Sequence, residues 1–210
     1  MLQTILLYLS NLSALLAVWT GRRERTVIWL YALLSFIFDM NGYVLNALDI
    51  ERKWASNIFF LVEFVLISTY FIREVFPGYK KALRIIVAVI SLYFVVHTCM
   101  KSVWVSNYVD AAIMYELYIF FSICGLYKVM QEIKYVMVER NPLFIFCIAF
   151  LLYASGSLFI FLVGNDFLQT ERDFIIGIWK LVRNPLNIVK NLLIAYGLLL
   201  IRRNHLAQGA

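Results

Sequence analysis

Residues 179–203 read WKLVRNPLNIVKNLLIAYGLLLIRR, a stretch that is long enough to span a membrane and yet has one polar face. On a helix that turns about 100° per residue, its polar positions share one side. They are Lys180, Asn184, Asn187 and Asn191 on the face itself, and Arg183 and Lys190 on the adjoining flank. An amide or ammonium group that faces hydrocarbon is costly, so this side is expected to face other helices or a water-filled cavity. The rest of the chain must supply its partners.

The composition is that of a membrane protein. Hydrophobic residues make up 63% of the 210 residues, charged residues only 15%, and the mean hydropathy is +0.80. Seven apolar runs are long enough to cross about 30 Å of hydrocarbon at about 1.5 Å per residue. They are residues 2–20, 27–47, 55–75, 83–100, 108–129 and 143–164, and a last run that ends at 201. We therefore expect an all-α protein with one domain, residues 1–210, built as a seven-helix transmembrane bundle.

The basic residues are unevenly divided between the loops. Most follow the first, third and fifth spans or lie in the C-terminal tail: Arg22, Arg23, Arg25, Arg73, Lys80, Lys81, Arg84, Lys128, Lys134, Arg140, Arg202 and Arg203. The opposite loops contain only Arg52, Lys53, Lys101 and Arg172. The positive-inside rule then predicts an N-terminus outside and a C-terminus in the cytoplasm. The net charge of +6 is explained by topology, and no nucleic-acid partner is expected.

The first apolar run could be a signal peptide and the three cysteines could form a disulfide or a metal site, but the sequence favours other interpretations of both. The basic cluster follows the first apolar run, whereas a signal peptide carries its positive charge before that run, so the first span is expected to be retained. Cys99, Cys124 and Cys147 are odd in number and all lie within spans. Neither a disulfide framework nor a metal site is indicated, and no cofactor is expected.

Partners for the last span are expected on the second and third spans. Tyr31, Ser35, Asp39, Gly42 and Asn46 share one stripe of the second span, and Asp39 is too deep for its short side chain to reach the surface. Glu63, Glu116 and Lys190 come to a similar depth, about 8 to 12 Å below the outer surface by helix rise. We therefore predict an ionic layer in an outward-facing vestibule, with Glu63 or Asp39 as the counter-ion of Lys190. The alternative is a charge network that only fixes helix packing.

Some residues are secondary candidates: Ser35, His97, Glu116, Lys180 and Arg183. His97 lies about one turn below the outer end of the fourth span and is either a hydrogen-bonded packing residue or a pH sensor. Glu116 in the fifth span faces away from the tyrosines of that span. It is therefore expected to pair with another neighbour or to lie at a subunit contact.

The sequence Arg-Asn-Pro-Leu occurs at residues 140–143 and again at residues 183–186. In the first copy Asn141 and Pro142 are suited to the N-cap and the first position of a helix. The last span could therefore restart at residues 184–185, or it could continue through Pro185 with a kink. Small residues near Gly156 in the sixth span predict close helix packing.

Three segments resemble a known group of proteins. They are residues 59–64 (FFLVEF), residues 142–159 with their Tyr-Ala-Ser-Gly-Ser-Leu-Phe core, and residues 187–197. They are similar to segments of uncharacterised small seven-span integral membrane proteins of Bacteroidota. The resemblance implies the same topology and a bacterial inner membrane.

These observations favour a non-enzymatic membrane protein that is sensory or ligand-binding. The predicted binding residues are Asp39, Asn46, Glu63, Asn184, Asn187, Lys190 and Asn191. The expected partners are membrane lipids, a small polar or amphiphilic ligand, and a membrane or cytoplasmic protein. The first alternative is a small-solute transporter, which the aliphatic residues 192–194 and 198–201 disfavour.

Two further alternatives are disfavoured by missing motifs. An intramembrane hydrolase would be expected to show Gly-x-Ser-x-Gly, His-Glu-x-x-His or a histidine-rich zinc site, whereas His97 is the one histidine within a span. A retinal protein with its chromophore linked to Lys190 is disfavoured, because the third and sixth spans of this chain lack the motifs of microbial rhodopsins.

Overall fold

The computed structural model describes residues 2–22, 26–47, 53–101, 108–132, 137–167 and 172–208. All regular structure in these ranges is helical, as expected. The α-helices are α1 (Leu2–Gly21), α2 (Val27–Ala47), α3 (Lys53–Glu74), α4 (Lys80–Lys101), α5 (Tyr108–Glu132), α6 (Pro142–Phe167) and α7 (Arg172–Gln208), and η1 (Pro77–Tyr79) and η2 (Val138–Arg140) are short 3-10 helices. The helix ends lie close to the predicted ones, except that α7 continues well beyond residue 201.

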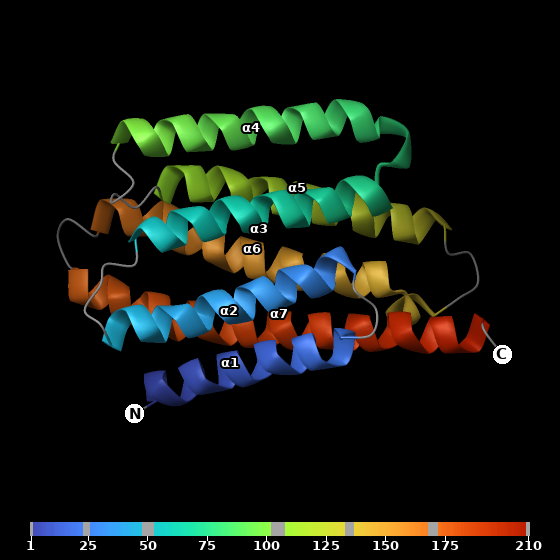
Figure 1. Ribbon diagram of the computed structural model, residues 1–210, viewed down its shortest axis with the longest axis horizontal. Helices are drawn as coiled ribbons and strands as arrows, with labels where there is room; N and C mark the ends of the chain where they lie inside the picture. Colours follow the sequence, from blue (N-terminus) through green and yellow to red (C-terminus); the bar gives the residue numbers. More distant parts are fainter. Residues whose placement is uncertain are drawn as a thin grey trace.

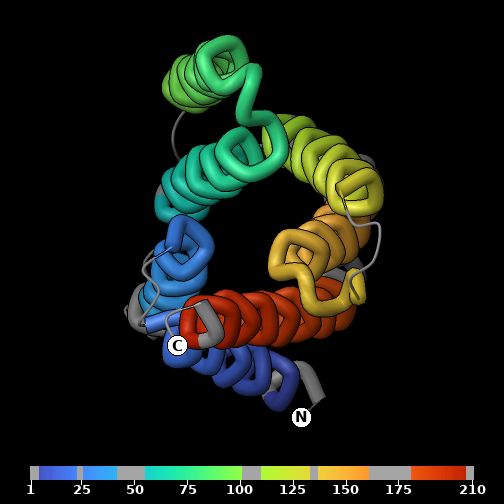
Figure 2. The backbone as a smooth tube through the Cα atoms, turned by 90° about the vertical axis from the view of Figure 1, so that its right-hand side faces the viewer, coloured from blue at the N-terminus to red at the C-terminus, as the bar shows by residue number. Residues whose placement is uncertain are grey.

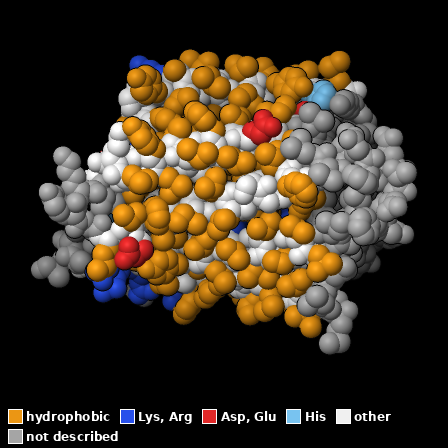
Figure 3. All heavy atoms as spheres, turned by 180° about the vertical axis from the view of Figure 1, so that it is seen from behind, with side chains coloured by type: hydrophobic (Ala, Val, Ile, Leu, Met, Phe, Trp, Pro, Cys, Tyr) orange, Lys and Arg blue, Asp and Glu red, His pale blue; other side chains and the backbone are white. Residues whose placement is uncertain are grey.

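The helices have the character of membrane spans. In the described residues, five segments are long and apolar enough to cross a bilayer: Ala55–Glu74, Pro77–Met100, Asp110–Glu132, Pro142–Ile160 and Leu181–Leu206. α1 and α2 contribute the shorter apolar stretches Ile5–Gly21 and Val27–Asn41. Figure 3 shows a face whose middle is covered by hydrophobic side chains, with Lys and Arg gathered mainly toward its left-hand end. Soluble proteins rarely expose so continuous an apolar surface, so the chain is a multi-pass membrane protein.

The helices run lengthwise through the bundle (Figure 1). Seen from the end, α2, α3, α5, α6 and α7 surround a common centre, whereas α1 and α4 lie outside them (Figure 2). α1 packs mainly on α7, and α4 packs mainly on α3. The predicted binding residues of α2, α3 and α7 therefore belong to helices of the inner ring.

The two copies of Arg-Asn-Pro-Leu have different structures. At the first copy α6 begins at Pro142, and the Leu143 backbone N–H donates to Asn141 Oδ1 at 2.9 Å, as the sequence predicts. At the second copy α7 runs through Pro185 as one helix, so the alternative of a restart at residues 184–185 is wrong. Membrane helices tolerate an internal proline because neighbouring groups can satisfy the carbonyl that loses its hydrogen bond.

Two glycines bring α6 and α7 close together. A Cβ atom added at Gly156 would overlap the Leu186 side chain, and one added at Gly197 would overlap the Phe146 ring. The close packing predicted at Gly156 is thus confirmed. The two helices approach each other at two levels of the bundle.

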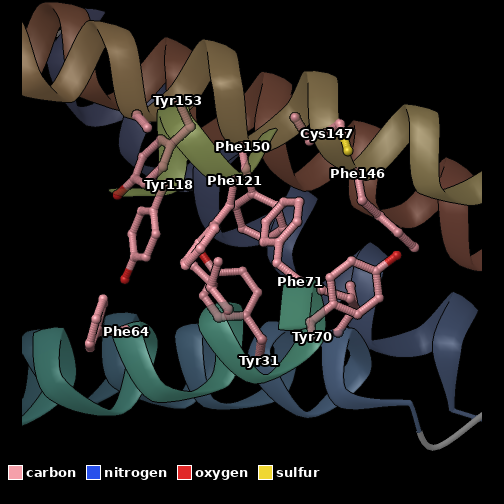
Figure 4. Close-up of a cluster of buried hydrophobic side chains, with 14 of the residues drawn as sticks. Tyr31, Phe64, Tyr70, Phe71, Tyr118, Phe121, Phe146, Cys147, Phe150 and Tyr153 are labelled. Carbon is pink, nitrogen blue, oxygen red and sulfur yellow. The ribbon is translucent and has the colours of Figure 1, made fainter. Parts of the chain in front are cut away.

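Aromatic rings fill the interior near the end where α3 ends and α6 begins (Figure 4). The Phe71 ring lies 5.9 Å from the Phe121 ring and 5.8 Å from the Phe150 ring, and the Tyr70 ring meets the Phe146 ring edge-on at 5.6 Å. All five side chains are buried. We call these five residues the aromatic cluster. The buried charged side chains of α3 and α7 lie farther toward the middle of those helices.

Candidate functional site

Lys190 is part of a buried hydrogen-bond network that joins three helices. Its Nζ donates to the Tyr31 hydroxyl of α2 at 2.7 Å, and that hydroxyl donates to Glu63 Oε1 of α3 at 2.9 Å. Lys190 is 2% exposed and Glu63 is 1% exposed. The two charged side chains lie at one level, as predicted, but a tyrosine hydroxyl connects them. No direct ion pair between Lys190 and a carboxylate occurs among the described residues.

Tyr153 of α6 completes this network. Lys190 Nζ lies 4.1 Å from the centre of the Tyr153 ring and 5.1 Å from the centre of the Tyr31 ring, within the range of a cation–π interaction. The Tyr153 hydroxyl lies 3.4 Å from the Tyr115 hydroxyl of α5 and is also hydrogen-bonded to Arg183 of α7. We call Tyr31, Glu63, Tyr153 and Lys190 the central network. Through Tyr115, the network connects all five helices of the inner ring.

Asp39 lies on the more accessible side of the central network. Its carboxyl group is hydrogen-bonded to the Asn187 side chain, and its cationic neighbours are Lys190 and Arg183. Asp39, Arg183, Asn184 and Asn187 are all partly exposed, whereas the charged residues of the central network are buried. The predicted contact between the polar faces of the second and seventh spans is therefore confirmed at Asp39 and Asn187.

Three oxygen atoms in this region lack a hydrogen-bond donor among the described residues: Asp39 Oδ2, Glu63 Oε2 and Asn187 Oδ1. They come from α2, α3 and α7, and Asp39 is an electrostatic neighbour of Glu63 and a hydrogen-bond partner of Asn187. An unsatisfied buried polar group costs about 1–3 kcal/mol, so such groups usually have a partner in a functioning protein. The site can accept hydrogen bonds from a small polar molecule or from water. No group of three or more His, Cys, Asp or Glu in the described part of the chain is arranged to hold a metal ion.

Asn191 faces α1 and lies apart from the acids. Its Nδ2 lies 3.3 Å from Ser13 Oγ and 3.5 Å from the Ser10 carbonyl oxygen, while Asn187 Nδ2 donates to Ser10 Oγ at 2.8 Å. The two serines were not predicted as partners of α7. Their spacing of three residues, which puts them on one side of α1, is the signal that could have identified them. Asn191 therefore contributes to the packing of α7 against α1.

Two secondary candidates also lie away from the centre. His97 Nδ1 is 2.6 Å from Asp110 Oδ2, so this histidine pairs with the first turn of α5. Asp110 was not among the predicted residues, because an acid near the end of a span, where charged residues are common, gives no distinct signal. Glu116 is exposed on α5, in agreement with its different facing, so the depth that it was predicted to share with Lys190 does not bring it into the ionic layer. It therefore does not share the central site.

The remaining predicted residues are placed as follows. Ser35 is buried on α2, and Asn184 is partly exposed on α7 near Arg183. The side chains of Asn46 and Lys180 are outside the part of the chain whose side chains the structure describes. Glu63 and Lys190 lie near the middle of α3 and α7.

Comparisons with known proteins give no assignment for this arrangement. No protein family, no curated protein and no solved structure significantly matches the chain.

Proposed function

We propose that this chain is a non-enzymatic seven-span sensor that binds a small polar ligand in the bundle. The observation that carries the proposal is the group of three acceptor oxygens, on Asp39, Glu63 and Asn187, for which the described part of the chain supplies no donor. A ligand with hydroxyl, amide or ammonium groups would supply those donors. Asp39 and Asn187 are partly exposed and would meet the ligand first, whereas Glu63 lies deeper.

The central network offers a way for binding to affect the rest of the bundle. The ligand would contact α2, α3 and α7, and the Lys190 side chain connects the same helices to Tyr153 of α6. A ligand shifts a conformational equilibrium only through its different affinity for the two states. Donors that satisfy the free oxygens in one packing of these helices would favour that packing. The change would then reach a membrane or cytoplasmic protein partner.

The ligand site can be tested with purified protein in nanodiscs and a panel of small polar compounds. A compound that binds the folded protein raises its melting temperature, by mass action. We expect at least one compound to stabilise the parent protein and the Glu116→Gln variant but not Asp39→Asn. Glu116→Gln is a matched control, because it neutralises an exposed acid on α5. Equal stabilisation of Asp39→Asn and the parent protein would contradict the proposed site.

The proposed topology has the N-terminus outside and the C-terminus in the cytoplasm of a bacterial inner membrane. The distribution of basic residues supports it. Figure 1 is consistent with an odd number of crossings, because α1 begins at the opposite end of the bundle from the end of α7. The resemblance to seven-span proteins of Bacteroidota supports the same arrangement.

Thiol labelling of whole cells tests this topology. In a background that lacks Cys99, Cys124 and Cys147, we expect an impermeant reagent to label Gln3→Cys and Gln169→Cys from outside. Gly78→Cys and Gln208→Cys should be labelled only after the cells are opened, because the positive-inside rule places both in the cytoplasm. The reverse pattern would overturn the orientation.

Transport has less support than sensing. In the half of the bundle that α7 enters after Lys190, Ile194 and Leu198 belong to the same buried core as Phe71, Phe146 and Phe150. A polar solute would need donors and acceptors along its path, and these side chains offer none. Retinal binding is also disfavoured, since Lys190 Nζ donates to Tyr31 and lies over the Tyr153 ring. Adding retinal to the purified protein should give no visible absorbance band.

A further inference from the structure

A groove lies between α3 and α4, away from the central network. Its cavity volume is about 490 Å³, which is within the range of roughly 300–1,000 Å³ that is usual for small-molecule sites. The lining is apolar except for Thr69, Arg84 and Ser91, and no acidic side chain takes part in it. The groove therefore combines an apolar channel with a single cation.

The position of α4 explains why the groove is open. α4 lies outside the inner ring and packs mainly on α3 (Figure 2). Where it faces α3, Ala88 and Ser91 are small and leave space that larger side chains would fill. In a membrane this space opens toward the surrounding lipid. The natural occupant is therefore a molecule that is already present in the bilayer.

The charge in the groove selects among lipids. Arg84 lies in the second turn of α4 and is exposed, and Lys80 lies one turn before it on the same side of the helix. An arginine side chain binds phosphate oxygens with two parallel hydrogen bonds. Two neighbouring cations favour a headgroup with net negative charge over a zwitterionic one. From Arg84 to Val95 the helix rises about 16 Å, enough for much of an acyl chain to lie beside it.

We propose that the groove between α3 and α4 binds one anionic phospholipid, with its phosphate at Arg84 and one acyl chain along the apolar lining toward Val95. The lipid fills the space that α4 leaves beside α3 and fixes α4 against the bundle. This site is separate from the polar ligand site. None of the groove residues belongs to the central network, and none carries one of the three acceptor oxygens of Asp39, Glu63 and Asn187.

Native mass spectrometry of the detergent-solubilised protein tests the headgroup. Phosphatidylglycerol and phosphatidylcholine with identical acyl chains are titrated separately. The parent protein should retain phosphatidylglycerol preferentially, and Arg84→Gln should weaken that binding by on the order of tenfold through loss of the charge-assisted contact. Arg73→Gln is the matched control, because Arg73 is an exposed arginine at the end of α3 outside the groove, 3.4 Å from Glu74. It should bind phosphatidylglycerol like the parent.

A second pair of variants tests the acyl-chain channel. Ala88→Leu adds bulk inside the groove, whereas Ala82→Leu adds the same bulk to an exposed position of α4 outside the lining. Ala88→Leu should weaken the binding of both lipids, and Ala82→Leu should leave it unchanged. Equal retention of the two lipids by the parent protein, or equal losses in Arg84→Gln and Arg73→Gln, would overturn the headgroup assignment. Unchanged binding in Ala88→Leu would overturn the groove as the site.

Discussion

In the aromatic cluster, Phe71, Phe121 and Phe150 pack ring against ring, whereas in the central network Lys190, Tyr31 and Glu63 are joined by hydrogen bonds. Apolar cores tolerate different side chains of similar volume. A buried polar group instead needs a partner at the right distance and angle, and its loss leaves the other members unsatisfied. Small changes in helix position should therefore cost more in the central network, which makes it the better place to detect a ligand.

The largest expected effect is on Lys190. Lys190→Met keeps a side chain of similar length but removes the ammonium group that compensates the acids nearby. Breaking a buried charge pair from one side commonly costs about 3–5 kcal/mol. We expect a marked fall in the melting temperature of the purified protein, measured in one fixed detergent.

A double-mutant cycle shows which acid depends on Lys190. Glu63→Gln combined with Lys190→Met should recover part of the loss, with a coupling energy of about 0.5–3 kcal/mol. The same cycle with Asp39→Asn measures the contribution of the second acid. If Lys190→Met is as stable as the parent and neither acid shows coupling, the central network does not depend on charge.

Tyr31→Phe tests the hydroxyl that bridges Lys190 and Glu63. The change leaves the ring but removes two hydrogen bonds, so both charged groups lose a buried partner. We expect a loss of about 1–3 kcal/mol in the free energy of unfolding, measured by denaturant titration in mixed micelles.

The matched control is Tyr70→Phe in the aromatic cluster. Tyr70 contacts the Phe71 and Phe146 rings, and no hydrogen bond of its hydroxyl is found among the described residues. Its change should stay within about 0.5 kcal/mol of the parent. Equal losses for the two tyrosines would mean that ring packing and not hydrogen bonding decides both regions.

The features of the molecule also differ in how far they can be predicted from the sequence. The helix positions follow from hydropathy, because a bilayer fixes the length of an apolar span. The contact between Asp39 and Asn187 follows from helical phase, since each residue lies on the polar stripe of its helix. The bridging role of Tyr31 does not follow from depth and phase, which bring charged residues to one level but cannot show that a third side chain lies between them.

Other features depend on contacts that a single helix does not encode. Ser10 of α1 hydrogen-bonds with α7 although isolated serines in an apolar helix are ordinary. The path of α7 through Pro185 depends on neighbouring helices, while the identical tetrapeptide at residues 140–143 starts a helix. The pairing of His97 with Asp110 joins two helices through residues of unremarkable spacing. Each of these features is decided by tertiary packing.

The smallest expected difference compares two glycines at the interface of α6 and α7. At Gly197 a new methyl group would meet the Phe146 ring, which Tyr70 holds from another side, so the ring has little room to move. At Gly156 the methyl group would meet the end of the Leu186 side chain, which can change rotamer. Alanine also favours a helix over glycine by roughly 0.5–1 kcal/mol. Gly197→Ala should therefore lower the free energy of unfolding by about 1 kcal/mol, whereas Gly156→Ala should be close to neutral. If denaturant titration instead shows the larger loss for Gly156→Ala, then Leu186 is fixed more firmly than Phe146, and the aromatic cluster is the more adaptable of the two regions.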